Sequence, residues 1–367
     1  MLQERTLGDN QPPVKMTLTL DNGSQFTGVS FGADKAIAGE VVFNTAMMGY
    51  PESLTDPSYI GQIMVLTYPL IGNYGVPTRE QLENGLSRFM ESHRIHPEAI
   101  VVSDYSEEYS HWNAQSSLAS WLKEENIVGL TGIDTRRLTK LLREEGSMKG
   151  KIIPDGAADI PFVDPHSINL VAQASCNEIT TYGNGSKRVV LIDCGVKHSI
   201  IRCLLEYDVT VIRVPWDYDF TTMDYDGLFI SNGPGNPNLC GKTVEHIRKA
   251  MDSNKPICGI CMGNQLLAKA AGADIYKLKY GHRSHNQPVR QTGTNHCFIT
   301  SQNHGYAVDN DTLSSDWEAL FINMNDGTNE GIRHRSKPFF SAQFHPEACS
   351  GPEDAEFLFW DFVRLLN

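Results

Sequence analysis

The sequence predicts an α/β protein of two domains: a mixed β/α domain, followed by a domain whose mainly parallel sheet is flanked by helices. Three observations support this prediction. The chain has 367 residues, and domains commonly contain roughly 150. Its second half alternates short apolar runs with helical segments, which is typical of parallel sheets covered by helices. A stretch rich in Pro and Gly separates the two halves.

The first predicted domain covers residues 1–153 and begins with a β-hairpin. In residues 15–31, polar and apolar residues alternate on both sides of an Asp-Asn-Gly-Ser turn. Apolar runs predict three further strands, at residues 40–44, 62–67 and 99–103. Helical spacing predicts two helices, at residues 116–125 and 135–145, the second capped by Asp134 or Thr135.

The second predicted domain covers residues 188–367. It follows a linker at residues 154–187, which contains three prolines and a Tyr-Gly-Asn-Gly-Ser run. Apolar runs predict four strands, at residues 189–193, 209–214, 227–231 and 256–260. Helical spacing predicts three helices, at residues 200–207, 244–252 and 265–271. In such sheets, functional sites form in the loops beyond the carboxyl ends of the strands.

The composition excludes several kinds of partner. A net charge of −13, without a concentrated basic patch, argues against nucleic acid or an anionic membrane surface. No apolar stretch approaches the ~18 residues of a membrane span. The cysteines are scattered rather than arranged as a disulfide framework, which favours a reducing compartment. We therefore expect the protein in the cytoplasm, or in the mitochondrial matrix if an organelle leader has been removed.

The most informative segment is Lys-Pro-Ile-Cys-Gly-Ile-Cys-Met-Gly-Asn-Gln-Leu, residues 255–266. An apolar strand runs into Gly-x-Cys-x-Gly and then a helix, which is the pattern of a nucleophile elbow with Cys261 as the nucleophile. Glycines on both sides allow a sharp turn in strained backbone. At the start of a helix, the dipole and the free N–H groups favour the thiolate, which is the attacking form.

Two other interpretations of this segment remain open. Cys258 and Cys261 form a C-x-x-C pair, as in redox dithiols and half zinc sites, but no second metal-binding pair accompanies it. Both cysteines could also be small buried residues. Cys258 in particular is expected in the core, because it lies inside the predicted strand.

A cysteine nucleophile needs a base and a group that orients the base. His345 and Glu347 follow a short apolar run, and residues two apart in an extended chain point to the same side. His345 can take the thiol proton and return it to the leaving group, while Glu347 can accept the other imidazole N–H. The negative oxygen of the intermediate needs preorganised donors, and we predict the N–H groups of Met262 and Gly235.

Together these segments resemble the class I, or triad, glutamine amidotransferases, in which Gly-Pro-Gly, Gly-x-Cys-x-Gly-x-Gln and His-Pro-Glu occur in this order. Five motifs in the first half resemble the small subunit, or fused glutaminase domain, of carbamoyl-phosphate synthetase. They are Gly-Glu-Val-Val-Phe-Asn-Thr (39–45), Gly-Tyr-Pro-Glu (49–52), Leu-Thr-Asp-Pro-Ser-Tyr (54–59), Tyr-Pro-Leu-Ile-Gly-Asn (68–73) and Ile-Asp-Thr-Arg (133–136). The resemblance covers nearly the whole chain.

The resemblance implies hydrolysis of L-glutamine through a thioester on Cys261, with His345 and Glu347 as the other catalytic residues. It implies that Ser58 reaches the substrate from the first domain. It also implies a glutamine pocket lined by Gly233, Gly235, Met262, Gln265, Asn303, Gly305 and Tyr306.

The resemblance further implies that the ammonia passes to a large synthetase subunit or domain, which makes carbamoyl phosphate for a pyrimidine or arginine/urea pathway. No G-x-x-x-x-G-K-[ST] phosphate loop occurs in the sequence. We therefore expect no cofactor or metal in this chain, and expect ATP, Mg²⁺ and bicarbonate on the partner.

One residue departs from the family pattern. Asn264 stands where glutaminases of this family usually carry histidine, and the ammonia-dependent urea-cycle form also has asparagine there. That form lacks the cysteine, whereas Cys261 and Gln265 are present here. The departure leaves open a regulatory or scaffolding subunit with weak or no turnover. A stand-alone γ-glutamyl hydrolase is the other alternative.

Overall fold

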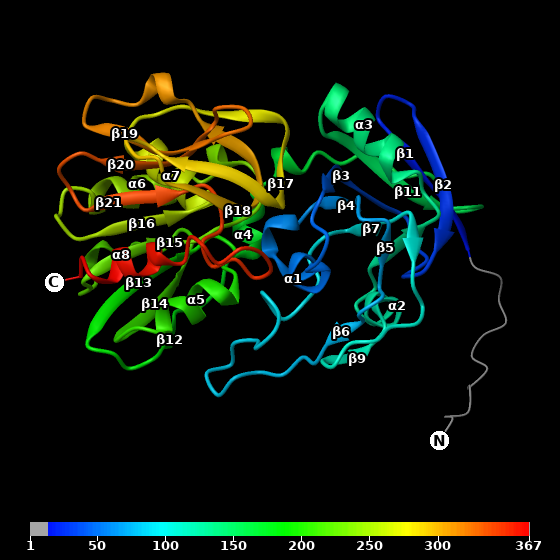
Figure 1. Cartoon of the computed structure of the whole chain (residues 1–367), viewed down its shortest axis with the longest axis horizontal. Coiled ribbons are helices and arrows are strands. Elements are labelled where there is room, and N and C mark those ends of the chain that lie inside the picture. The colour runs from blue at the N-terminus through cyan, green and yellow to red at the C-terminus, as the bar shows by residue number, and fades with distance from the viewer. Residues whose placement is uncertain (1–13, 367) are drawn as a thin grey trace.

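The computed structural model describes residues 14–366, which form two sheet systems side by side, one from each half of the chain (Figure 1). The first is a closed barrel. In order around the barrel, its strands are β1 (Lys15–Leu20), β11 (Met148–Pro154), β3 (Ile37–Asn44), β4 (Gln62–Leu66), β7 (Ala99–Val101), β10 (Val128–Thr131) and β2 (Gln25–Ser30). Two small sheets lie outside it, β5 (Leu70–Ile71) with β8 (Asp104–Tyr105) and β6 (Val76–Pro77) with β9 (Ala114–Ser116).

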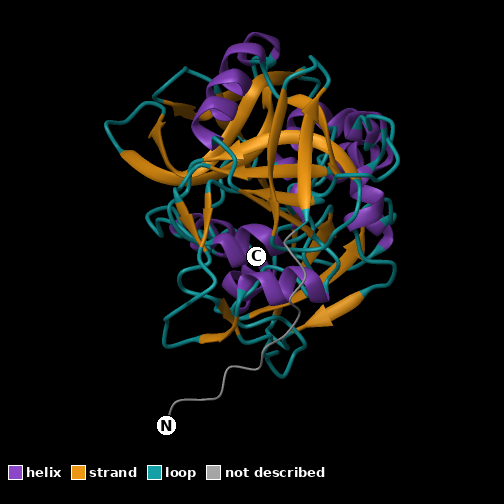
Figure 2. Cartoon of the chain, turned by 90° about the vertical axis from the view of Figure 1, so that its right-hand side faces the viewer, coloured by secondary structure: helices purple, strands orange, loops and turns teal. Residues whose placement is uncertain are grey.

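The predicted strands and helices of the first half are present, but their closure into a barrel was not predicted. β1 and β2 form the expected antiparallel hairpin. Three helices accompany the barrel, namely α1 (Tyr50–Thr55), α2 (Leu118–Glu124) and α3 (Thr135–Glu145). Asp134 caps α3 by accepting a hydrogen bond from the backbone N–H of Arg137 (2.8 Å). Figure 2 shows the molecule from the barrel side. Closure requires β1 to pair with β11, far away in sequence, and local patterns do not reveal such pairing.

The segment predicted to be a linker has more structure than its Pro and Gly content indicates. It contains a 3-10 turn at Pro165–Ser167, helix α4 (Leu170–Ala174) and strand β12 (Thr180–Tyr182). β12 pairs with β14 (Val209–Pro215) at the edge of the second sheet. Residues 154–187 are therefore a linker only in part, and the domain boundaries stay a prediction.

The second sheet has a parallel centre with antiparallel strands on both sides. Its order is β12, β14, β13 (Lys187–Asp193), β15 (Gly227–Ile230), β16 (Ile257–Ile260), β21 (Phe339–Ala342), β20 (Asn329–His334), β19 (Trp317–Asn323), β17 (Ile275–Gln291) and β18 (Cys297–Val308). The strands from β14 to β21 are parallel, as predicted. The antiparallel strands that extend this centre were not predicted.

Helices cover both faces of the parallel centre, which confirms the predicted layers. α5 (His198–Leu205) and α8 (Phe357–Val363) pack on one face, and α6 (Gly241–Ala250) and α7 (Met262–Ala270) pack on the other. Successive residues of β13 alternate between the two cores, with Val189 on the first face and Val190 on the second. In residues 14–366, no helix is long and apolar enough to cross a membrane.

The carboxyl ends of the parallel strands lie at one edge of the second sheet, where they meet the first half of the chain. Asn232, just after β15, donates a hydrogen bond to Ser58 of the first half (3.0 Å). Asn303 of β18 donates one to Asp56 (3.0 Å). The candidate site therefore lies where the two halves meet.

Candidate active site

Cys261 lies at a sharp turn between β16 and α7. Its φ of 54° and ψ of −102° are unusual for a residue with a side chain, so the backbone is strained there. A Cβ on Gly259 would lie 2.5 Å from the carbonyl oxygen of Gly263, and one on Gly263 would lie 2.2 Å from that of Ile230. Both positions therefore require glycine. The structure contains the strand–turn–helix elbow that the sequence predicts.

His345 reaches the thiol from the chain that continues β21, the strand next to β16. Its backbone N–H donates to the carbonyl oxygen of Ser301 (2.9 Å), and its Nδ1 lies 2.6 Å from Oε1 of Glu347. Its Nε2 is buried and has no hydrogen-bond partner among the described residues. Sγ of Cys261 lies 3.6 Å from the carbonyl oxygen of Asn303. The structure brings the three predicted catalytic residues into one buried cluster.

Charges in this cluster set the protonation of His345. Burial and the charge of Lys197 lower the pKa of His345, but the charge of Glu347 and the close approach of Cys261 and Glu347 to the imidazole raise it to about 10. Burial raises the pKa of Glu347, but Lys197 and His345 lower it to about 2. At neutral pH the imidazole therefore carries a proton and Glu347 is ionised, so Nε2 can give its proton to a leaving amine.

Lys197 is part of this cluster, and the sequence reasoning missed it. Its Nζ lies 3.0 Å from Oε1 of Glu347, and its side chain is 5% exposed. Its backbone N–H donates to Oδ1 of Asn232 (3.0 Å), which fixes the start of α5. One signal was available, because Lys197 follows the carboxyl end of a predicted strand, where sites form in such sheets.

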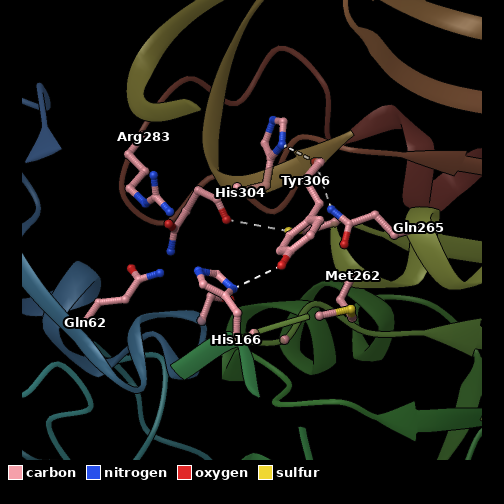
Figure 3. Close-up of a pocket in the computed structure, with 13 residues that line it drawn as sticks. Gln62, His166, Met262, Gln265, Arg283, His304 and Tyr306 are labelled. Atoms are coloured by element: carbon pink, nitrogen blue, oxygen red, sulfur yellow. Dashed lines mark hydrogen bonds between the residues drawn. The ribbon is translucent and has the colours of Figure 1, made fainter. Parts of the chain in front are cut away.

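A pocket with about 370 Å³ of empty space, part of it open to solvent, lies beside Cys261 (Figure 3). All eight residues predicted to bind substrate line the pocket. They come from a 3-10 turn (Ser58), the loop after β15 (Gly233, Gly235), α7 (Met262, Gln265) and β18 (Asn303, Gly305, Tyr306).

Four further side chains line the pocket and were not predicted, namely Gln62, His166, Arg283 and His304. His166 comes from the segment predicted to be a linker. Its Nε2 bonds to Oε1 of Glu40 (2.8 Å) and its Nδ1 to the hydroxyl of Tyr306 (3.0 Å). No sequence pattern pointed to His166, because its partners lie in the barrel and in β18.

Asp56 holds the two halves of the chain together at the pocket. Its carboxylate accepts hydrogen bonds from the backbone N–H of Ser58 (2.9 Å), from Nδ2 of Asn303 (3.0 Å) and from Nδ2 of Asn232 (3.4 Å). Ser58 thus reaches the site from the first half, as the resemblance implies. Asp56, which positions it, was not predicted.

Two protein-family models match the chain. "Carbamoyl-phosphate synthase small chain, CPSase domain" matches residues 18–152, and "Glutamine amidotransferase class-I" matches residues 190–365. The carbamoyl phosphate synthase arginine-specific small chain of Saccharomyces cerevisiae is 49% identical over 360 residues, which are 95% of this chain and 88% of that one. The chain belongs to the carbamoyl-phosphate synthase small-chain family.

Longer proteins also contain a segment similar to this small-chain family member. The multifunctional protein CAD of Squalus acanthias is 51% identical over 95% of this chain, which spans 16% of that protein. The mitochondrial carbamoyl-phosphate synthase [ammonia] of Homo sapiens is 47% identical over 95% of this chain, which spans 24% of it. These relatives confirm the resemblance to a small subunit or fused domain.

In this family member, Asn264 does not line the pocket. Its Nδ2 donates to Oε1 of Gln343 (2.9 Å), and its Oδ1 accepts from the hydroxyl of Ser341 (2.7 Å). Oε1 of Gln343 also accepts a hydrogen bond from Nε2 of Gln265, a pocket residue (3.2 Å). Asn264 therefore contacts the site only indirectly, through Gln343.

Cys258 has a structural place in β16. Its side chain is buried in a core with Phe229 and Phe359, and burial raises the pKa of its thiol. All eight cysteines of the chain are free. This confirms the expectation that Cys258 belongs to the core.

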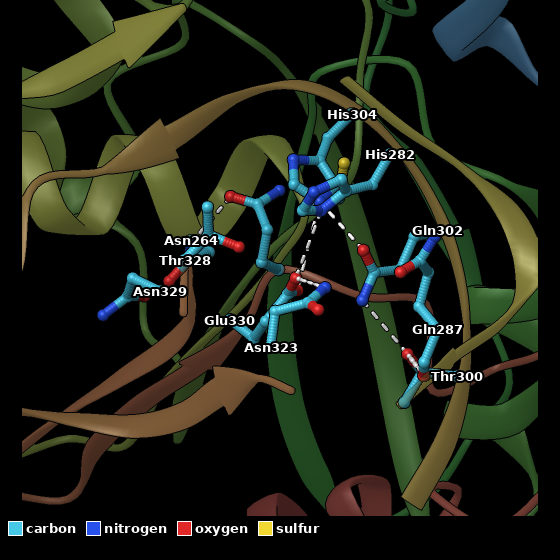
Figure 4. A network of polar contacts seen from close by, with 12 residues as sticks. Asn264, His282, Gln287, Thr300, Gln302, His304, Asn323, Thr328, Asn329 and Glu330 are labelled. Carbon is cyan, nitrogen blue, oxygen red and sulfur yellow. Dashed lines mark hydrogen bonds and ion pairs between the residues drawn. The ribbon is translucent and has the colours of Figure 1, made fainter. Parts of the chain in front are cut away.

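In residues 14–366, one buried group of side chains could hold a metal ion: His282, Glu330 and His304, the last of which also lines the pocket (Figure 4). His282 already lies between two carboxylates, with Nε2 2.8 Å from Asp326 and Nδ1 3.4 Å from Glu330. Burial lowers the pKa of His282, but these two carboxylates raise it to about 9. At neutral pH a proton on His282 therefore supplies the positive charge that the group requires.

Proposed function

We propose that this chain hydrolyses L-glutamine to L-glutamate and ammonia, and that the ammonia goes to a large synthetase subunit or domain that makes carbamoyl phosphate. One observation carries the proposal. Cys261 lies in a strained elbow beside a pocket, with His345 and Glu347 buried next to it. Membership of the small-chain family supports the same function.

In the proposed reaction, His345 holds the proton of Cys261, so Cys261 reacts as a thiolate. Its sulfur attacks the side-chain amide carbon of glutamine, and the N–H groups of Met262 and Gly235 stabilise the negative oxygen. Protonated His345 gives its Nε2 proton to the amide nitrogen. The C–N bond breaks, and ammonia leaves while the γ-glutamyl group stays on sulfur as a thioester. Neutral His345 then takes a proton from water, whose oxygen attacks the thioester. Glutamate departs, and thiolate and imidazolium are restored.

In this proposal, the eight predicted pocket residues bind the glutamine. ATP, Mg²⁺ and bicarbonate bind to the synthetase partner. The carbamoyl phosphate serves an arginine or a pyrimidine pathway. A reducing compartment, cytoplasm or mitochondrial matrix, suits a chain that depends on a free thiol.

Replacement of the nucleophile tests the proposal. In Cys261→Ala, glutamine-dependent activity should fall by about 10³-fold or more, because catalytic residues of this kind act as a unit. Ammonia-dependent synthesis by the complex with its synthetase should persist. Steady-state assays with glutamine and with ammonium salts measure both. Cys297→Ala, which removes an exposed thiol on β18, is the matched control and should keep both activities.

Glutamine use that survives in Cys261→Ala would rule out the proposed nucleophile. A scaffolding subunit without turnover would instead give no covalent adduct on Cys261 with a glutamine-like alkylating reagent. The structure does not favour that alternative, because Asn264, which motivated it, is not among the residues that line the pocket. A stand-alone γ-glutamyl hydrolase would be active without copurifying with a large synthetase chain.

A further inference from the structure

Arg283 presents a buried positive charge to the pocket. It lies on β17, directly opposite Asn303 of β18 in the strand register, and is 5% exposed. Its Nη1–H donates to the carbonyl oxygen of Tyr280 (2.9 Å). Its Nε is buried without a hydrogen-bond partner, and the guanidinium forms no ion pair with the residues described. Burying a positive charge without an ion-pair partner costs free energy, unless a ligand supplies the negative charge.

Burial raises the pKa of the nearby Glu40 carboxylate, but His166, Arg283 and Lys277 lower it, so the charge of Glu40 interacts with Arg283 without forming an ion pair with it. Oε1 of Glu40 lies 2.8 Å from Nε2 of His166 and 2.8 Å from Nζ of Lys277. It also accepts a hydrogen bond from the hydroxyl of Ser147 (2.7 Å). Moreover, none of the residues that line the pocket is an aspartate or glutamate. Among the described residues that line the pocket, Arg283 is the one with a permanent charge.

Two glycines give the guanidinium its position. A Cβ on Gly281, whose φ is +71°, would lie 2.5 Å from Nη1, and a Cβ on Gly305 would lie 3.4 Å from Nη2. Because position 305 has no side chain, the guanidinium remains open to the pocket. Figure 3 shows Arg283 with Gln62 and His166 on one side of the pocket, whereas Gln265 and Met262 lie on the other.

A bound glutamine would have its side-chain amide at Cys261 and its α-carboxylate at the opposite end of the molecule. The thiol contacts the carbonyl oxygen of Asn303 (3.6 Å), the residue across from Arg283. One end of the pocket thus holds the nucleophile, and a neighbouring part holds an unpaired guanidinium. A guanidinium fork matches a carboxylate in shape and charge.

We propose that Arg283 binds the α-carboxylate of the substrate and thereby selects the free amino acid over glutamine whose carboxyl group is blocked. This inference rests on the proposed function, since it takes glutamine as the substrate. Arg283 is then a specificity-determining residue. Removal of the Arg283 guanidinium should therefore weaken the binding of glutamine, but it should not slow the reaction steps at Cys261.

The test compares L-glutamine with L-glutaminamide, in which a neutral amide replaces the α-carboxylate. In Arg283→Gln, kcat/KM for L-glutamine should fall about 30-fold or more, mainly through KM, because one partner of a buried charge pair is removed. In the same variant, kcat/KM for L-glutaminamide should hardly change. Arg283→Lys, which keeps the charge without the fork, should give an intermediate loss. Arg290→Gln, an exposed charge on the same strand, should behave like the wild type.

Binding to the inactive Cys261→Ala protein, measured by calorimetry with both compounds, separates this inference from the proposed function. If Arg283→Gln in that background weakens L-glutamine alone, the inference stands even where the wild type shows no turnover. Equal losses for both compounds, with an unchanged melting temperature, would show that Arg283 only shapes the pocket. Unaltered binding of L-glutamine would also overturn the inference.

Discussion

The charge of His345 depends on the side chain behind it. Glu347 raises the pKa of His345 to about 10, although burial acts in the opposite direction. Lys197 in turn lowers the pKa of Glu347, which burial alone would raise. Glu347 therefore lies between two positive groups, and its charge keeps a proton on the imidazole although the charge of Lys197 acts against it. A histidine buried in this way without the carboxylate would be neutral at physiological pH.

Glu347→Gln tests this account at the scale of one residue. The change removes the charge that raises the pKa of His345, so this pKa should fall from about 10 to below the ordinary value of about 6.5. NMR titration of ¹⁵N-labelled histidine measures it, with His345→Asn to assign the signal. Glu318→Gln, which removes a carboxylate near the surface, should leave the pKa of His345 unchanged. A His345 pKa that stays near 10 without Glu347 would contradict the assignment.

The elbow between β16 and α7 shows why an element of this kind can be recognised in a sequence. Its strain is local, and the glycines that permit it are close to Cys261 in sequence. Gly259 and Gly263 face backbone atoms rather than flexible side chains, so neither position can accept a Cβ without movement of the backbone. The Gly-x-Cys-x-Gly pattern is therefore a steric requirement of the turn itself.

Gly259→Ala should deform this element. Its Cβ would meet the carbonyl oxygen of Gly263 at 2.5 Å, so we expect a loss of at least about 2 kcal/mol in the free energy of unfolding and loss of glutaminase activity. Urea denaturation and the steady-state assay measure the two effects. Gly241→Ala, at the start of α6, meets nothing within 4 Å and should be nearly neutral. A stable and active Gly259→Ala would show that the turn is not as tight as described.

At the scale of the whole molecule, the site is assembled from both halves of the chain. Asp56 and Ser58 come from the first half and bond to Asn232 and Asn303 of the second. Glu91 adds another link, because it accepts hydrogen bonds from Ser199 and forms an ion pair with Arg202 (3.3 Å). The first half of the chain is therefore a structural part of the pocket.

Asp56→Ala should weaken catalysis without unfolding either half. Without the carboxylate, Asn232 and Asn303 lose a shared partner and the pocket loses its alignment, so we expect kcat/KM to fall about tenfold or more. Glutaminase kinetics measure this loss, and circular dichroism checks the fold. Asp104→Ala, which removes an exposed carboxylate of the first half, is the matched control. An unchanged kcat/KM in Asp56→Ala would show that the two halves are not coupled through this residue.

Local sequence patterns were sufficient to predict the hairpin, some of the strands and helices of each half, the parallel centre and the elbow at Cys261. Each depends on the alternation or spacing of neighbouring residues, which a sequence displays directly. The sequence also indicated His345 and Glu347, because their spacing places both on one side of an extended chain. The family resemblance added the eight pocket residues, all of which line one cavity.

Only the tertiary structure decided the closure of the barrel, the antiparallel strands beside the parallel centre and the roles of Lys197, His166 and Arg283. His166 is in place because Glu40, 126 positions away, accepts its hydrogen bond. Lys197 matters because the fold puts its ammonium 3.0 Å from Glu347. Such features depend on contacts between segments that are distant in sequence. These contacts are stabilised by packing and by the pairing of buried charges, which no local sequence pattern reveals.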